Sequence, residues 1–141
     1  MTADQMAALH ALCFTTPRPC RADEFTDLLS ATGCILVTRD EGFALGRAIA
    51  GEAELLTIAV HPDHRRKGIA RDVLSEFLTK AAEQGAQNVF LEVAQPNHAA
   101  QALYQAAGFE RIGQRKVYYK TPQGAHIDAL ILGITLPTLT K

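Results

Sequence analysis

The chain has no long apolar run, no basic-then-apolar leader and almost no net charge. No run approaches the ~20 apolar residues that a membrane-spanning helix needs, so the sequence predicts neither membrane insertion nor secretion. The formal net charge is −1 and the sequence pI is about 6.5. Such a balanced surface argues against general binding to nucleic acid or to a membrane, and any anionic partner should be small.

Cysteine is also scarce. The three cysteines, Cys13, Cys20 and Cys34, form no C-x-x-C pair and are odd in number. Thiols of this kind beside apolar neighbours are more typical of a reduced cytosolic protein than of a disulfide framework. We therefore expect a cytoplasmic protein in which all three cysteines are structural.

Metal ligands are not clustered either. His61 and His64 flank Pro62 in a turn, and neither a cysteine nor a group of carboxylates lies close to them in the sequence. A structural or catalytic metal ion usually needs three or four such ligands. We therefore expect no metal site.

The periodicity of the apolar residues predicts the order helix, helix, three strands, helix, strand, helix and two strands. Thr2-x-x-Gln5 is a possible capping box for a first helix that ends near Phe14. The other elements are expected as a helix from about residue 23, strands over 34–38, 43–50 and 55–60, a helix from 69 closed by Gly85, a strand over 89–93, a helix over 98–107, and strands near 109–119 and 127–135. With 141 residues, 48% of them hydrophobic, this predicts one mixed α/β domain over residues 1–141.

The most informative stretch, residues 60–71, joins an apolar strand to an amphipathic helix through a basic turn. The first amides of a helix lack intrahelical partners and the helix dipole is positive there, so a phosphate is bound well. Gly68 has no Cβ and allows a phosphate to approach closely, while Arg65, Arg66, Lys67 and Arg71 add positive charge. The pattern is typical of an anion site, although a solvated basic helix start has the same pattern.

Three polar residues further along the chain are candidates for chemistry. Glu92 lies within the apolar strand, with Phe90 and Ala94 on its face, either as an edge glutamate that reaches solvent or as a general base. Tyr104 is either a core aromatic or a proton donor, since a phenol of pKa ~10 is neutral at pH 7. Asn97 suits a helix N-cap, which is compatible with binding a ligand.

Several motifs carry a resemblance to a known family. Residues 65–70 read Arg-x-x-Gly-x-Ala after an apolar strand, which resembles the acyl-CoA pyrophosphate loop of the GNAT N-acetyltransferases. Residues 97–109 read Asn-x-x-Ala-x-x-Leu-Tyr-x-x-x-Gly-Phe and follow Leu-Glu-Val at 91–93. Together with Arg-x-x-Tyr-Tyr at 115–119 and Gly-x-x-x-Asp-Ala at 124–129, they are similar to the bacterial ribosomal-protein alanine N-acetyltransferases within that family.

The resemblance, which runs from about residue 53 to the end, implies a GNAT fold. That fold is a mixed, mostly antiparallel sheet flanked by helices, and the family's first edge strand is missing here because the first helix begins at once. The resemblance also implies direct transfer of an acetyl group from acetyl-CoA, with Glu92 as base and Tyr104 as acid. The implied cofactor-binding residues are Ile58, Ala59, Val60, Arg66, Lys67, Gly68, Ile69, Ala70, Arg71 and Asn97.

The implied acceptor is the N-terminal alanine α-amine of a small-subunit ribosomal protein, with no nucleic-acid or membrane partner. Residues 115–119 and Asp128 resemble the part of the family that shapes the peptide end, where Asp128 would attract a basic terminus. The chain departs from the family at Ala70, where many members have glycine, and in having no tryptophan near residues 13–20. Two alternatives stay open: a GNAT that acts on a small-molecule amine or a lysine side chain, and a non-catalytic CoA-binding regulatory module.

Overall fold

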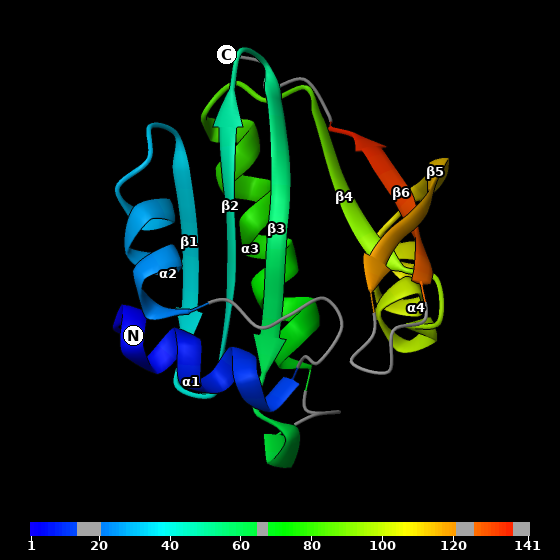
Figure 1. Cartoon of the computed structure of the whole chain (residues 1–141). Helices are drawn as coiled ribbons and strands as arrows, with labels where there is room; N and C mark the ends of the chain where they lie inside the picture. The colour runs from blue at the N-terminus through cyan, green and yellow to red at the C-terminus, as the bar shows by residue number, and fades with distance from the viewer. Residues whose placement is uncertain (14–20, 65–67, 121–125, 137–141) are drawn as a thin grey trace.

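The computed structural model describes residues 1–13, 21–64, 68–120 and 126–136, which form a single six-stranded sheet with helices on both faces (Figure 1). The elements are α1 (Ala3–Cys13), α2 (Ala22–Leu29), β1 (Cys34–Arg39), β2 (Gly42–Ile49), β3 (Glu52–Val60), a 3₁₀ turn (Pro62–His64), α3 (Ile69–Glu83), β4 (Asn88–Ala94), α4 (His98–Ala106), β5 (Glu110–Lys120) and β6 (His126–Thr135). The expected helices and strands are present in the expected order. The short 3₁₀ turn was not expected from the sequence.

The sheet has the order β1-β2-β3-β4-β6-β5, and all neighbouring pairs except β3 with β4 are antiparallel. The expectation of a mixed, mostly antiparallel sheet is therefore confirmed. In the described part of the chain no strand precedes α1, and β1 forms one edge of the sheet, as the sequence predicts. None of the described helices is both long and apolar enough to cross a membrane.

Local signals in the sequence fix several helix ends. Gln5 donates its backbone N–H to Thr2 Oγ1 at 3.1 Å, and the Thr2 N–H donates to Gln5 Oε1 at 2.8 Å, which completes the expected capping box. Asn97 Oδ1 accepts a hydrogen bond of 3.2 Å from an amide in the first turn of α4. Gly85 and Gly108, with φ of +88° and +105°, follow the ends of α3 and α4, where a left-handed residue turns the chain away.

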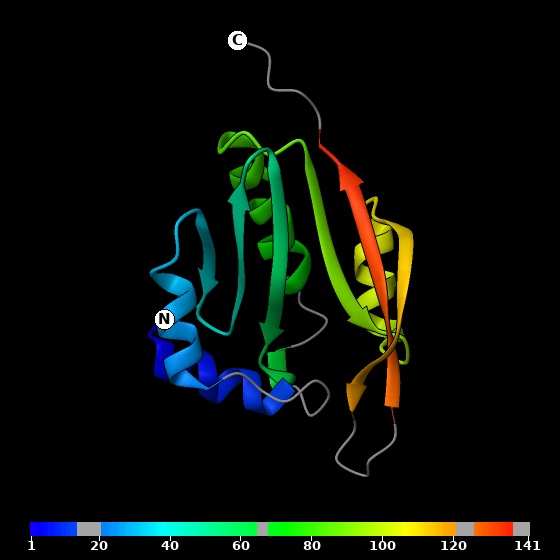
Figure 2. The same ribbon diagram turned by 45° about the horizontal axis from the view of Figure 1, so that its top comes forward.

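Two hydrophobic cores lie on opposite faces of the sheet. The larger one lies between the sheet and the helices α3 and α4, and Phe77, Leu91 and Tyr104 belong to it. The smaller one lies under α1 and α2, which cover β1 to β3 from the other face (Figure 2). There the rings of Phe25 and Phe43 meet edge to face at 5.6 Å. In this view neither α1 nor α2 lies against the same face of β4, β6 and β5.

A β-bulge in β3 determines where its side chains point. Pairing with β2 shifts between Leu55 and Thr57, which leaves Leu56 as the extra residue. Because a bulge shifts the alternation of a strand by one, Glu54 and Thr57 lie on the same face. That face is the one covered by α1, since Thr57 Oγ1 lies 3.2 Å from Nε2 of His10.

Strands β3 and β4 pair over only three positions, ending at Glu54↔Phe90, and then separate (Figure 1). We call the segment beyond this last pair the β3–β4 divide. On its two sides β3 stays paired with β2 as far as Val60, and β4 with β6 as far as Ala94. The bulge at Leu56 follows the last pair directly, and bulges bend a strand and end its pairing.

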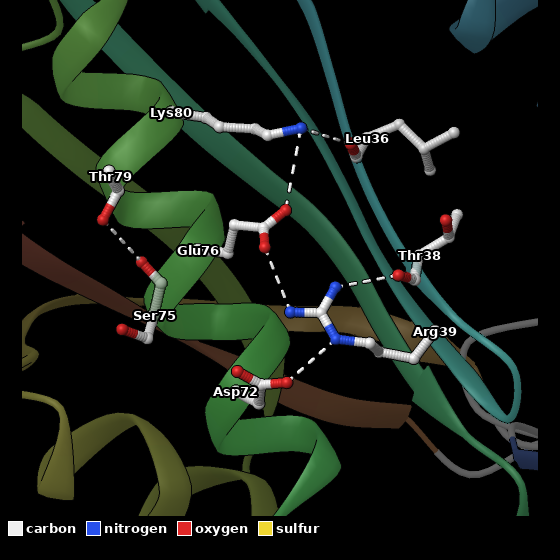
Figure 3. A network of polar contacts seen from close by, with 8 residues as sticks. All are labelled: Leu36, Thr38, Arg39, Asp72, Ser75, Glu76, Thr79 and Lys80. Carbon is white, nitrogen blue, oxygen red and sulfur yellow. Dashed lines mark hydrogen bonds and ion pairs between the residues drawn. The ribbon is translucent and has the colours of Figure 1, made fainter.

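The edge strand β1 is tied to α3 by a network of charged side chains (Figure 3). Arg39 contacts two carboxylates of α3, at 2.9 and 3.0 Å, and the second of them, Glu76, lies 3.7 Å from Lys80. Lys80 Nζ and Arg39 Nη1 also donate to the backbone oxygens of Leu36 and Thr38 on β1. Charged side chains along an edge strand discourage its pairing with another chain.

Candidate active site

The predicted site residues lie on elements that flank the β3–β4 divide. Residues 58–60 form the end of β3, and residues 69–71 form the first turn of α3. Glu92 lies in β4, while Asn97 and Tyr104 belong to the start and the body of α4. Both helices therefore begin after the carboxyl ends of the two diverging strands (Figure 2).

The last three residues of β3 present a strand edge to the divide. Ile58, Ala59 and Val60 pair with β2, and in the described chain no strand pairs with them on the side of β4. An extended ligand that carries amide groups can add to such an edge as a strand would. This segment is therefore suited to a pantetheine-like chain.

The start of α3 has the backbone conformation that the anion-site prediction needs. Gly68 is the N-cap, with φ of +79° and ψ of 6°, and no side chain caps the helix. Among the described residues, no heavy atom would lie within 4 Å of a Cβ at Gly68, so they leave room there. The first-turn amides and the helix dipole together favour an anion. Arg65, Arg66 and Lys67 lie outside the described residues.

Glu92 lies on β4, an interior strand of the sheet, two residues beyond its last pair with β3. It pairs with Ile131 of β6, while its neighbours Leu91 and Val93 are buried in the larger core. Its own side chain therefore points to the opposite face, together with Phe90, as the alternation predicts. The side chain is 21% exposed, so the carboxylate is partly shielded from water.

Glu92 forms an ion pair that the sequence did not reveal. Arg115 Nη1 donates to Glu92 Oε1 at 2.8 Å, although Arg115 lies on β5 and β6 runs between the two strands. The residue paired with Arg115 on β6 is Ala129, whose small side chain allows this contact. The sequence marks Arg115 as part of a motif, but only the register of the three strands brings it to Glu92.

Glu54 is a second carboxylate at the divide, also missed by the sequence analysis. Burial raises the pKa of the Glu54 carboxyl, Arg47 at 3.9 Å opposes this rise, and the charge of Glu92 adds to it. A shallow depression of about 150 Å³ beside it is lined by Arg47, Ile49, Glu52, Glu54 and Phe90. In the sequence, the feature that marks Glu54 is the same as for Glu92, namely a charged residue among the apolar residues of a strand.

Tyr104 lies on the opposite face of the sheet from Glu92. Its ring is 8% exposed, belongs to the larger core, and meets Phe109 edge to face at 5.7 Å. The reading of a core aromatic therefore describes the ring, and it leaves open what the hydroxyl group does. A carboxylate and a phenol are groups that can accept and donate a proton, and the sheet holds these two on opposite faces.

Asp128 does not share a face with Arg115. Asp128 Oδ2 accepts a hydrogen bond of 2.7 Å from Gln114, which pairs with the core residue Leu130. Arg115 is the next residue along β5 and therefore points to the other face, toward Glu92. The expectation that residues 115–119 and Asp128 shape the peptide end of the site stays a prediction. The side chains of Tyr118 and Tyr119 lie outside the described residues.

The described cysteine, Cys34, lies away from the β3–β4 divide. Cys34 is a half-buried free thiol on the edge strand β1, and burial raises its pKa. The side chains of Cys13 and Cys20 lie outside the described part. Over residues whose positions the structure gives, no group of three or more His, Cys, Asp or Glu side chains is arranged to hold a metal ion.

Comparison with known proteins identifies the family. Residues 3–109 match the model of the acetyltransferase (GNAT) family. The ribosomal protein bS18 alanine N-acetyltransferases of Salmonella typhimurium and Escherichia coli are 38% and 36% identical to this chain over 98 and 94 residues. These matches cover 70% and 67% of this chain, and 66% and 63% of the relatives, so the match spans just under two thirds of their length.

The crystal structure of the ribosomal-protein-S18-alanine N-acetyltransferase from Escherichia coli has the same fold. It matches with a TM-score of 0.80 and 29% identity, over 100% of this chain and 92% of that chain. The family expected from the motifs at 65–70 and 97–109 is confirmed by these comparisons. The chain belongs to the acetyltransferase (GNAT) family.

Proposed function

We propose that the protein, acting as one domain over residues 1–141, transfers the acetyl group of acetyl-CoA to the N-terminal alanine α-amine of a small-subunit ribosomal protein. The placement of Glu92 and Tyr104 on opposite faces of the β3–β4 divide carries the chemical part of this proposal. The names of the relatives from Salmonella typhimurium and Escherichia coli support the acceptor. The proposal implies a cytoplasmic location and needs no metal, nucleic acid or membrane.

Acetyl-CoA fits the chemistry of the residues at the divide. Residues 58–60 offer backbone amides along a strand edge, and the α3 N-terminus at Gly68 offers the room and the dipole that a pyrophosphate needs. Residues 66–71 and Asn97 are the remaining proposed contacts, and their cations are suited to phosphate. When bound, acetyl-CoA supplies the thioester whose acetyl group is transferred.

Glu92 is the proposed proton acceptor for the incoming amine. The ammonium N–H bond breaks and its proton passes to a carboxylate oxygen of Glu92, so the nitrogen lone pair is free to attack the thioester carbon. An α-amine has a pKa of ~8, against ~10.4 for lysine, so it demands less of this base than lysine does. The choice of an N-terminal acceptor is consistent with a carboxylate as the base.

Tyr104 is the proposed proton donor on the other side. As the C–N bond forms and the C–S bond breaks, the departing thiolate takes the phenolic proton of Tyr104. The nitrogen of the new amide gives up its second proton, which restores the Tyr104 phenol, and Glu92 releases the first proton to water, so that one proton is set free for each acetyl group transferred. The cysteines have no part in this direct transfer, since Cys34 lies on the far edge of the sheet and no acetyl-cysteine is required.

Mass spectrometry of acceptors after incubation with protein and acetyl-CoA tests the proposal. We expect a basic peptide that begins with alanine to gain one acetyl group at its α-amine, and small-subunit ribosomal proteins to show one acetylated member. A polyamine and free lysine, supplied at the same concentration, should stay unmodified. Acetylation of those two with no activity on any peptide would overturn the acceptor, and binding of acetyl-CoA with no transfer at all would favour a regulatory module.

A further inference from the structure

Four charged side chains form a row across the β3–β4 divide, on the face opposite α3 and α4. Arg47 on β2 pairs with Glu54 on β3 at 3.9 Å, and Arg115 on β5 pairs with Glu92 on β4 at 2.8 Å. The two carboxylates are the inner members of the row and the two arginines are the outer ones. Each carboxylate thus has its own cation, and the pair that includes Glu92 is the closer one.

The inner carboxylates repel each other. The negative charge of Glu92 raises the pKa of Glu54, which shows that the two groups interact through space. Glu92 therefore lies beside a like charge, and the cation that binds its carboxylate matters for the proposed reaction.

The contact between Arg115 and Glu92 uses only one carboxylate oxygen. Arg115 Nη1 donates to Oε1 at 2.8 Å, and among the described residues no hydrogen bond reaches Oε2. A hydrogen bond between two charged groups fixes the orientation of the carboxylate as well as its charge. The second oxygen is therefore held in a defined place, from which it can accept a proton.

We propose that Arg115 is a positioning residue for Glu92, which holds Oε1 of the carboxylate in place and leaves Oε2 to the acceptor amine. This inference rests on the proposed function, because it assigns Arg115 a part in the proton transfer to Glu92. Arg115 does not itself exchange a proton, since a guanidinium stays charged at every pH at which the protein is folded.

Other charged groups on this face could also influence Glu92 and are part of the test. On the sheet they are Arg47, Glu52, Glu54 and Glu110, as the register of the strands places them. From α1, His10 reaches this face of β3 at Thr57. Asp128 belongs to the opposite face, where Gln114 binds it. Arg47 is the matched control, because it is an equally long cation in the same row, paired with Glu54 rather than Glu92.

Carbon-13 NMR of the side-chain carboxyl groups, followed over a pH titration, tests the inference without any substrate. The Glu92 signal is assigned by its loss in Glu92→Gln. We expect the Glu92 signal to differ from that of the parent in Arg115→Gln, because its contact with the guanidinium is lost, to stay near that of the parent in Arg115→Lys, and to change much less in Arg47→Gln. An unchanged Glu92 signal in Arg115→Gln, or an equal change in Arg47→Gln, would overturn the inference.

Kinetics with an alanine-terminated peptide gives the functional readout. In Arg115→Gln, kcat/KM should fall by about 10-fold on the acidic side of the profile and much less on the alkaline side, and Arg115→Lys should restore most of the loss. A uniform loss at every pH would mean that Arg115 only supports the fold. If the parent transfers no acetyl group, the proposed function fails, while the titration still decides whether Arg115 controls Glu92.

Discussion

At the scale of single residues, His10 shows how burial sets the charge of a side chain. It is 4% exposed, lies beside Thr57 and meets Phe25 edge to face at 5.7 Å. Burial lowers the pKa of His10 to about 4, against a partial opposing effect of the Glu24 charge. His10 is therefore neutral in the folded protein at neutral pH and forms part of the smaller core beneath α1.

This shift predicts a loss of stability in mild acid. The unfolded chain binds a proton on His10 near pH 6.5, whereas the folded protein does so only near pH 4. The contribution of neutral His10 to the free energy of unfolding is therefore complete above pH ~6.5 and is lost as the pH falls toward 4. From about pH 7 to about pH 5 the free energy of unfolding should fall by about 2 kcal/mol on this account. Urea unfolding of the parent and of His10→Gln measures it. Equal pH dependence in the two proteins would contradict the assignment.

A substitution at Tyr104 distinguishes its role in packing from its proposed role in proton transfer. Tyr104→Phe keeps the ring that packs against Phe109 in the larger core and removes only the proton donor. We expect kcat to fall by ~100-fold, while acetyl-CoA affinity and the free energy of unfolding change little. Steady-state kinetics and calorimetry check this together. An unchanged kcat would reduce Tyr104 to a core aromatic.

At the scale of elements, the local signals were readable in the sequence. Thr2 with Gln5 predicted the start of α1, Asn97 the start of α4 and Gly85 the end of α3, because capping depends on residues a few positions apart. Alternation in β4 also placed Glu92 on the correct face.

Contacts between strands were not readable in the same way. The pairing of Arg115 with Glu92 depends on the register of β4, β6 and β5, and the interaction of Glu54 with Glu92 depends on which strands are neighbours. The separation of β3 from β4 follows a bulge at Leu56, and a bulge in an apolar run leaves no distinct pattern in a single sequence. Long-range geometry therefore decided the part of the site that sequence reasoning missed.

The start of α3 gives a prediction with an internal control. Gly68 and Gly85 both have positive φ, +79° and +88°, and a Cβ at either one would have no heavy atom within 4 Å. Alanine is the better probe than valine, because β-branched residues are strongly strained at such φ. Gly68→Ala and Gly85→Ala should each lose about 1 kcal/mol of stability, and only Gly68→Ala should weaken acetyl-CoA binding. Calorimetry measures the affinity of each variant for acetyl-CoA. Equal affinities of the two variants would overturn the assignment of this turn to phosphate binding.

Gly46 on β2 lies very close to the bulged strand β3 and to α3. A Cβ there would lie 2.2 Å from the Glu54 carbonyl oxygen and 2.5 Å from the ring of Phe77, so backbone or core must move. Gly46→Ala should lower the free energy of unfolding by about 3 kcal/mol. Gly51→Ala, at φ +83° with open space around it, should cost only about 1 kcal/mol. Denaturant unfolding compares them, and equal losses would contradict this packing.

At the scale of the whole molecule, the sheet has charged side chains along its edge strand β1, and its strands β3 and β4 separate near its middle. The edge strand β1 is tied to α3 by Arg39 and Lys80 (Figure 3). Within the sheet, β3 and β4 separate after Glu54 while each keeps its outer partner strand. Helices α3 and α4 pack on one face of the sheet, while α1 and α2 cover β1 to β3 on the other. Glu92 and Tyr104 lie on opposite faces of this sheet.

The most direct test of the account is the pH profile of kcat/KM for an alanine-terminated peptide, measured for the parent and for Glu92→Gln. The amide keeps the shape of the side chain and cannot accept the proton of the amine. The account predicts that Glu92→Gln loses the acidic limb of the profile, with activity moved to higher pH, where the amine, of pKa ~8, is already free. A profile identical to that of the parent would contradict the account, since Glu92 would then take no part in the transfer.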